Sequence, residues 1–142
     1  MQYALTMLAY LVPTFALGFV WHLVLFANYY EALAIYRRDI IVPFGFVSML
    51  IQAAIFAWFY EVVFARRGQT ALARAAAYGA VGAVLSWSFT TLAVAAKNVM
   101  ASVPEYLLIE TLFTGVQWTL VAAATALVTS ASAPWSRRVS AN

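Results

Sequence analysis

The sequence predicts an all-α membrane protein, an antiparallel bundle of four transmembrane helices. Composition is the first observation behind this fold class. The 142 residues are 65% hydrophobic and only 9% charged, with a mean hydropathy of +0.87, whereas soluble domains are roughly half apolar and a quarter charged. The second observation is that the apolar residues form four stretches of about 20 residues or more, the length a helix needs to cross a bilayer.

Short segments that hold most of the formal charge separate the four predicted spans. We predict helices over residues 3–28, 40–61, 75–96 and 104–128. Pro43 and Pro104 stand near two of the helix starts, where the missing N–H of proline does little harm. Because the connections are short, neighbouring helices should pack antiparallel in a single domain, followed by a polar tail over residues 129–142.

Each predicted helix is nearly free of charged side chains. The first contains His22. Its apolar stretch is too long for a cleaved signal peptide, and it lacks the basic residues with which a signal peptide begins. The second and third carry no formal charge in their interiors, and the fourth contains Glu110. His22 and Glu110 are therefore the ionisable groups to explain.

Loop charges predict the orientation, and end-of-helix aromatics predict interfacial belts. One side of the membrane carries five cations, which are Arg66, Arg67, Arg74, Arg137 and Arg138. The other side carries three, which are Arg37, Arg38 and Lys97. The positive-inside rule then places both termini in the cytoplasm. The aromatic residues expected at the membrane surfaces are Tyr29, Tyr30, Trp58, Tyr60, Tyr106 and Trp135.

Composition also excludes several classes of site. The chain has no cysteine and a single histidine, which argues against disulfides, thiolate catalysis, iron–sulfur clusters and a zinc or copper site, so we expect no metal and no cofactor. The eight Lys and Arg residues are scattered, so we expect no nucleic-acid partner. P-loop, GxSxG, HExxH and dinucleotide motifs are absent from the sequence, and we do not predict an enzyme.

Small residues recur on one face of the third predicted helix. Gly79, Gly82, Ser86, Thr90 and Ala93 follow one another at spacings of three or four, and we call this set the small-residue seam. Such spacing lets two helix backbones approach closely and lets hydroxyl groups form hydrogen bonds between helices. The predicted helix-packing residues are Gly18, Gly79, Gly82 and Ser86.

Polar side chains on all four helices fall near one depth. His22 lies near the end of the first helix and Glu110 near the start of the fourth, each about 9 Å below the same interface. We expect an intramembrane polar cluster there. The candidate ligand-binding or proton-binding residues are His22, Ser48, Gln52, Thr90, Lys97, Glu110, Thr114 and Gln117.

His22 is the natural partner of Glu110, because an unpaired carboxylate inside a bilayer is unfavourable. One interpretation is a pair that exchanges a proton beside a pocket or a permeation path. The other is that the pair and its hydroxyl neighbours only hold the helices together. The sequence leaves both open.

The segments FALGFVWHLVLFANYY and ETLFTGVQW make the chain resemble small four-helix bacterial membrane proteins of unknown function. The residues that carry the resemblance are Gly18, Trp21, Tyr29, Tyr30, Glu110, Gly115 and Trp118. Some of those proteins have an acidic residue where this chain has Gly18. The resemblance implies a multi-pass protein of the bacterial inner membrane, and it implies no activity.

Three functions follow as hypotheses. The leading one is a homo-oligomeric bundle in the lipid bilayer that binds or moves a small solute or protons through the His22 and Glu110 region. The second is an accessory subunit or assembly factor whose small-residue seam docks onto a larger membrane complex. The third, a lipid-modifying membrane enzyme, is the least favoured because the chain shows no nucleophile with an obvious base.

Overall fold

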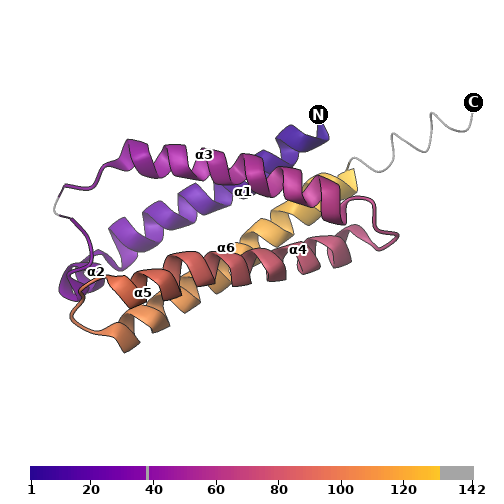
Figure 1. The fold of residues 1–142 in the computed structure, drawn as a ribbon. Helices are drawn as coiled ribbons and strands as arrows, with labels where there is room; N and C mark the ends of the chain where they lie inside the picture. The colour runs from indigo at the N-terminus through magenta and orange to yellow at the C-terminus, as the bar shows by residue number, and fades with distance from the viewer. Residues whose placement is uncertain (38, 132–142) are drawn as a thin grey trace, which may run out of the picture.

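The computed structural model describes residues 1–37 and 39–131, and every regular element in this part of the chain is a helix. The α-helices are α1 (Gln2–Val20), α2 (Ala27–Leu33), α3 (Val42–Phe59), α4 (Ala71–Ser86), α5 (Ala93–Lys97) and α6 (Val103–Ala131). Three π-helical segments continue them, which are η1 (Trp21–Leu25), η2 (Tyr60–Phe64) and η3 (Trp87–Leu92). Figure 1 shows the long helices running side by side and antiparallel.

The predicted fold class is confirmed. Four helical spans are long and apolar enough to cross a membrane, and they are Gln2–Leu25, Val42–Phe64, Ala71–Lys97 and Val103–Ser130. The start of α1, the turn after η2 and the end of α6 lie at one end of the bundle, and α2, α5 and the start of α6 lie at the other (Figure 1). α6 runs past the predicted boundary at 128, and Arg38, Trp135, Arg137, Arg138 and the rest of the predicted tail from 132 lie outside the described residues.

Two helix ends differ from the prediction for local reasons. The third span begins at Ala71 rather than at residue 75, because the Thr70 hydroxyl accepts the Ala73 N–H at 3.2 Å and caps the helix. The charged side chain of Arg74 bends back to the Gln69 carbonyl oxygen at 2.7 Å, so it fits the first turn. The first span ends at Leu25, because Phe26 leaves the helical region with φ −117° and ψ 19°.

The helices pack in the order α3, α1, α6, α4, with α1 and α6 in the middle. α4 lies close to α6 because its contact face is built from small residues. A Cβ at Gly79 would lie 2.9 Å from Cβ of Ala122, and a Cβ at Gly82 would overlap the Trp118 ring. The Trp118 indole N–H donates to Ser86 Oγ at 3.0 Å. The small-residue seam therefore faces α6 at these three positions.

Aromatic rings fill the half of the bundle near the start of α1. We call this group the aromatic cluster, and its members are Tyr10, Phe56, Tyr60, Phe64, Tyr78 and Trp118. Phe56 and Trp118 pack edge to face at 4.8 Å between ring centroids, and Tyr60 and Tyr78 do so at 5.2 Å. Tyr10 of α1 also packs against Phe56 and Trp118. Contacts within the cluster therefore join α1, α3, α4 and α6 and close this half of the bundle.

Replacing Gly82 by alanine tests the contact between α4 and α6. We expect the substitution to lower the free energy of unfolding by about 1–3 kcal/mol, because the added methyl group forces the Trp118 ring out of place. Unfolding in mixed micelles with increasing dodecyl sulfate measures this. Gly115→Ala is the matched control, since a Cβ there meets nothing within 4 Å. An equal effect of the two substitutions contradicts the packing described here.

Three of the tyrosines predicted for the interfacial belts have side chains that are enclosed by the protein. Tyr30, Tyr60 and Tyr106 are buried inside the bundle. Each hydroxyl donates to a group inside the bundle, respectively Glu110 Oε1 at 2.6 Å, Thr129 Oγ1 at 3.4 Å and the Thr90 carbonyl oxygen at 3.1 Å. A hydroxyl with an internal partner no longer requires contact with water.

The first half of α3 packs poorly against the rest of the bundle. Nearly every side chain from residue 41 to 51 is exposed, whereas Ala53, Ala57 and Tyr60 further along the span are buried. α3 packs along α1, and among the described residues the second span meets α4 mainly through η2. The bundle is therefore closed at the η2 end and open between α3 and α4 at the other.

Candidate functional site

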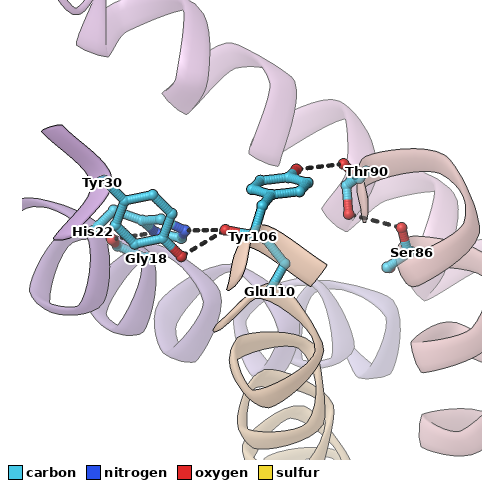
Figure 2. A network of polar contacts seen from close by, with 7 residues as sticks. All are labelled: Gly18, His22, Tyr30, Ser86, Thr90, Tyr106 and Glu110. Carbon is cyan, nitrogen blue, oxygen red and sulfur yellow. Dashed lines mark hydrogen bonds and ion pairs between the residues drawn. The ribbon is translucent and has the colours of Figure 1, made fainter. Parts of the chain in front are cut away.

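The site is centred on a contact between His22 of η1 and Glu110 of α6, shown in Figure 2. His22 Nε2 lies 3.3 Å from Glu110 Oε1. His22 Nδ1 lies 2.9 Å from the main-chain oxygen of Gly18. Because a carbonyl oxygen can only accept, Nδ1 carries a hydrogen, and Nε2 is the ring nitrogen that faces the carboxyl group.

Tyr30 of α2 is a second partner of the same carboxyl oxygen. Its hydroxyl donates to Glu110 Oε1 at 2.6 Å, and the residue is 1% exposed. Burial raises the pKa of the Tyr30 hydroxyl, and the hydrogen bond to Glu110 raises it further. The hydroxyl therefore remains protonated and remains a donor at neutral pH.

The position of Tyr30 depends on contacts between α2 and the segment that leads into α6. Ala34 ends α2 with a left-handed φ of 56°, and the Leu33 carbonyl oxygen accepts the Ala101 N–H at 3.0 Å. Tyr30 also packs in a small apolar core that includes Tyr106. These contacts turn α2 back over the start of α6, so the tyrosine faces Glu110.

A hydrogen bond between His22 Nε2 and Glu110 Oε1 requires one proton between the two atoms. If it is on Nε2, the pair is an imidazolium and a carboxylate, and if it is on Oε1, both groups are neutral. The net charge of the pair is zero in both arrangements, which suits a carboxyl group that is only 7% exposed. Glu110 Oε2 has no hydrogen-bond partner among the described residues, and Glu110 lines a cavity.

The cavity has a volume of about 470 Å³ and is bounded by all four spans. It extends from the segment after α2 to Tyr10 and Gln52, where the aromatic cluster closes it. α3 makes little contact with α4, and most side chains in the first half of α3 are exposed, so we infer that the cavity opens between α3 and α4. The polar side chains that line it within the bundle are Tyr10, Thr14, His22, Ser48, Gln52, Ser86, Thr90, Glu110 and Gln117.

Hydrogen bonds connect the polar lining across helices. Tyr10 donates to Gln52 Oε1 at 2.6 Å, and Gln52 Nε2 donates to Ser48 Oγ at 3.0 Å. Gln117 Nε2 donates to Thr14 Oγ1 at 3.2 Å. The inner wall is thus an ordered polar surface rather than a set of isolated groups, and it extends from His22 and Glu110 toward the middle of the bundle.

Two π-helical segments position residues of this wall. η1 contains His22 and η3 contains Thr90, whose hydroxyl donates to the Ser86 carbonyl oxygen at 2.8 Å. Short π-helical turns are rare and are frequent at functional sites, because they shift a side chain off the regular helical face. In Figure 2, Thr90 and Ser86 lie beyond Tyr106 on the side away from His22.

Two of the predicted site residues lie apart from the cavity. Thr114 is buried in α6 and does not line it, and Lys97 is exposed at the end of α5. Tyr10 and Thr14 line the cavity and Tyr30 holds the carboxyl group, although none of the three is among the predicted site residues. Thr14 and Tyr10 share one helical face with Gly18, so spacing alone contained a signal for them. The position of Tyr30 depends on α2, which spacing did not reveal.

Metal ligands do not gather in the described part of the chain, where no group of three or more His, Asp or Glu residues could hold an ion. The resemblance to small bacterial membrane proteins stays a prediction. No family model, curated protein or solved structure matches the chain.

Proposed function

We propose that this protein binds a small solute in the cavity and that His22 and Glu110 take up or release a proton when the solute binds. The observation that carries the proposal is a buried carboxyl group beside a cavity of about 470 Å³. One of its oxygens is held by His22 and Tyr30, and the other has no hydrogen-bond partner in the part of the chain that the structure describes. Intramembrane ionisable residues commonly mark substrate or proton pathways. A purely structural pair would not need a cavity next to it.

Binding at this site would also be the first step of transport. The cavity ends at the aromatic cluster, which separates it from the other end of the bundle. Passage of a solute across the membrane therefore requires rearrangement of that cluster, in keeping with alternating access to one binding site. Our proposal is limited to binding with proton exchange, which is the same step whether or not the solute then crosses the membrane.

The accessory-subunit hypothesis receives less support from the packing. It requires the small-residue seam to face outward, but Gly79, Gly82 and Ser86 contact α6 of the same chain.

The orientation of the chain in the membrane remains part of our proposal. Arg66, Arg67 and Arg74 lie at the end of the bundle that holds the start of α1, and the positive-inside rule places that end in the cytoplasm of a bacterial cell.

Proton exchange on binding provides the test. The purified protein in lipid nanodiscs is mixed, in weak buffer with a pH-sensitive dye, with a panel of small amines, carboxylates and alcohols. We expect at least one compound to change the number of bound protons, and we expect Glu110→Gln to reduce that change about tenfold or more, because an amide cannot take up or release the proton.

Glu105→Gln is the matched control, because Glu105 is an exposed acid at the start of the same helix. This variant should behave like the wild-type protein. If the same compounds bind and change the proton count equally in Glu110→Gln, the proposed role of the pair is wrong.

A further inference from the structure

The open side of the cavity lies at the depth of the lipid chains. Ser48 and Gln52 are about 9 Å and 15 Å along α3 from Val42, and the hydrocarbon core is about 30 Å thick. Both residues line the cavity and also a shallow pocket on the outer surface of α3. The neighbouring exposed side chains, such as Phe44 and Ile51, are apolar. A molecule that passes between α3 and α4 therefore comes from the bilayer.

We propose that the ligand is a lipid-soluble organic cation with a single positive charge, which enters between α3 and α4 and binds against the Glu110 carboxylate. This inference rests on the proposed function and specifies its ligand. Within the described part of the chain, the atom without a hydrogen-bond partner at this site is Glu110 Oε2, which offers negative charge and can accept hydrogen bonds. Among the described residues that line the cavity, Glu110 is the only acid.

Charge balance explains how a buried site accepts such a ligand. The His22 and Glu110 pair with one proton has no net charge. When a cation binds to the ionised carboxylate, the proton leaves, His22 keeps its hydrogen on Nδ1 and becomes neutral, and the net charge is again zero. Cation binding and proton release are therefore coupled one to one, and no unpaired charge is left in the low-dielectric interior.

The walls around the carboxyl group suit an apolar cation. Phe15, Phe19, Phe46 and Phe113 line the cavity together with Tyr10. Aromatic faces attract cations, and this attraction grows when water is excluded. Phe15 of α1 and Phe46 of α3 pack edge to face at 5.5 Å, and Phe113 packs on the His22 ring at 4.4 Å.

The other titratable groups near Glu110 agree with this assignment. Tyr30 donates to the carboxyl oxygen, and the hydroxyls of Tyr36 and Tyr106 are close enough to sense its charge. A protonated phenol carries no negative charge, so none of these three hydroxyl groups competes with Glu110 for a cation. Arg37 lines the cavity only at its exposed rim after α2, so a cation that enters between α3 and α4 does not pass it.

Two ions of nearly equal size and opposite charge test the inference. Binding of radiolabelled tetraphenylphosphonium is compared with that of tetraphenylborate, using the full chain in phosphatidylcholine nanodiscs and subtracting empty nanodiscs. We expect the phosphonium alone to bind saturably, with release of about one proton per cation and weaker binding at lower pH, because protons compete for the same carboxylate.

Variants assign this binding to the carboxylate. Glu110→Gln should weaken phosphonium binding by about 30-fold or more, as expected when one member of a buried charge pair is lost. Glu105→Gln should bind normally, and Glu110→Asp should retain measurable binding because it keeps the charge, which separates loss of the carboxylate from misfolding.

Equal binding of tetraphenylborate, or normal phosphonium binding by a folded Glu110→Gln variant, overturns the inference. A different outcome separates the two proposals. If the phosphonium does not bind but a neutral or anionic compound changes the proton count in a Glu110-dependent way, the cation inference is wrong and the proposed function stands. If no compound does so, both are wrong.

Discussion

Replacing Trp118 by alanine is expected to lower the free energy of unfolding by about 3 kcal/mol, the largest effect of a single substitution away from the cavity pair. The residue is 2% exposed, and its ring contacts Tyr10, Phe56 and Tyr78 while it lies against Gly82. Truncating a buried Trp or Phe to alanine costs about 3–5 kcal/mol in soluble proteins. Because lipid is as apolar as the ring, burial of the Trp118 ring in the bundle gains no hydrophobic free energy. The loss of stability then comes from lost packing and from the lost hydrogen bond to Ser86, so we expect the lower end of this range.

Trp58→Ala provides the control, because Trp58 is 59% exposed on α3 and faces outward. We expect it to change the free energy of unfolding by less than about 1 kcal/mol. Both variants can be compared by dodecyl sulfate titration of the protein in mixed micelles, followed by circular dichroism. Equal losses would mean that Trp118 does not organise the contact of α6 with α1 and α4.

The helices themselves were predictable because a bilayer leaves few alternatives. A chain with four long stretches nearly free of charge must satisfy its backbone polar groups internally, and helices do so. The common depth of His22 and Glu110 followed from the rise per residue, and the structure places the two side chains 3.3 Å apart. Local spacing also identified Gly79 and Gly82 as positions of close helix approach.

The cavity was not predictable, because it depends on how the helices are rotated and tilted. Apart from Ser48, the side chains in the first half of α3 are apolar, so its sequence contains no signal that distinguishes a face packed against another helix from an exposed one. The place of Tyr30 was hidden for a different reason. It depends on the break at Phe26, on the left-handed Ala34 and on the hydrogen bond between Leu33 and Ala101, two residues that are distant from each other in sequence.

A double-mutant cycle on His22 and Glu110 is expected to show strong coupling within the pair. Glu110→Leu leaves His22 Nε2 and the Tyr30 hydroxyl without their partner, and His22→Leu leaves the carboxyl group with Tyr30 alone. Each substitution should lower the free energy of unfolding by about 2–3 kcal/mol, since removing one member of a buried pair leaves the other uncompensated.

The double variant should be little less stable than either single variant, because two apolar side chains of similar size leave neither charge buried alone. The resulting coupling of about 2 kcal/mol would exceed the average of about 0.6 kcal/mol for hydrogen bonds between membrane helices. Additive losses would show that the two side chains do not interact in the folded protein. Strong coupling together with normal proton exchange in Glu110→Gln would instead mean that the pair only holds the first and fourth spans together. Stability and proton exchange must therefore be measured on the same preparations.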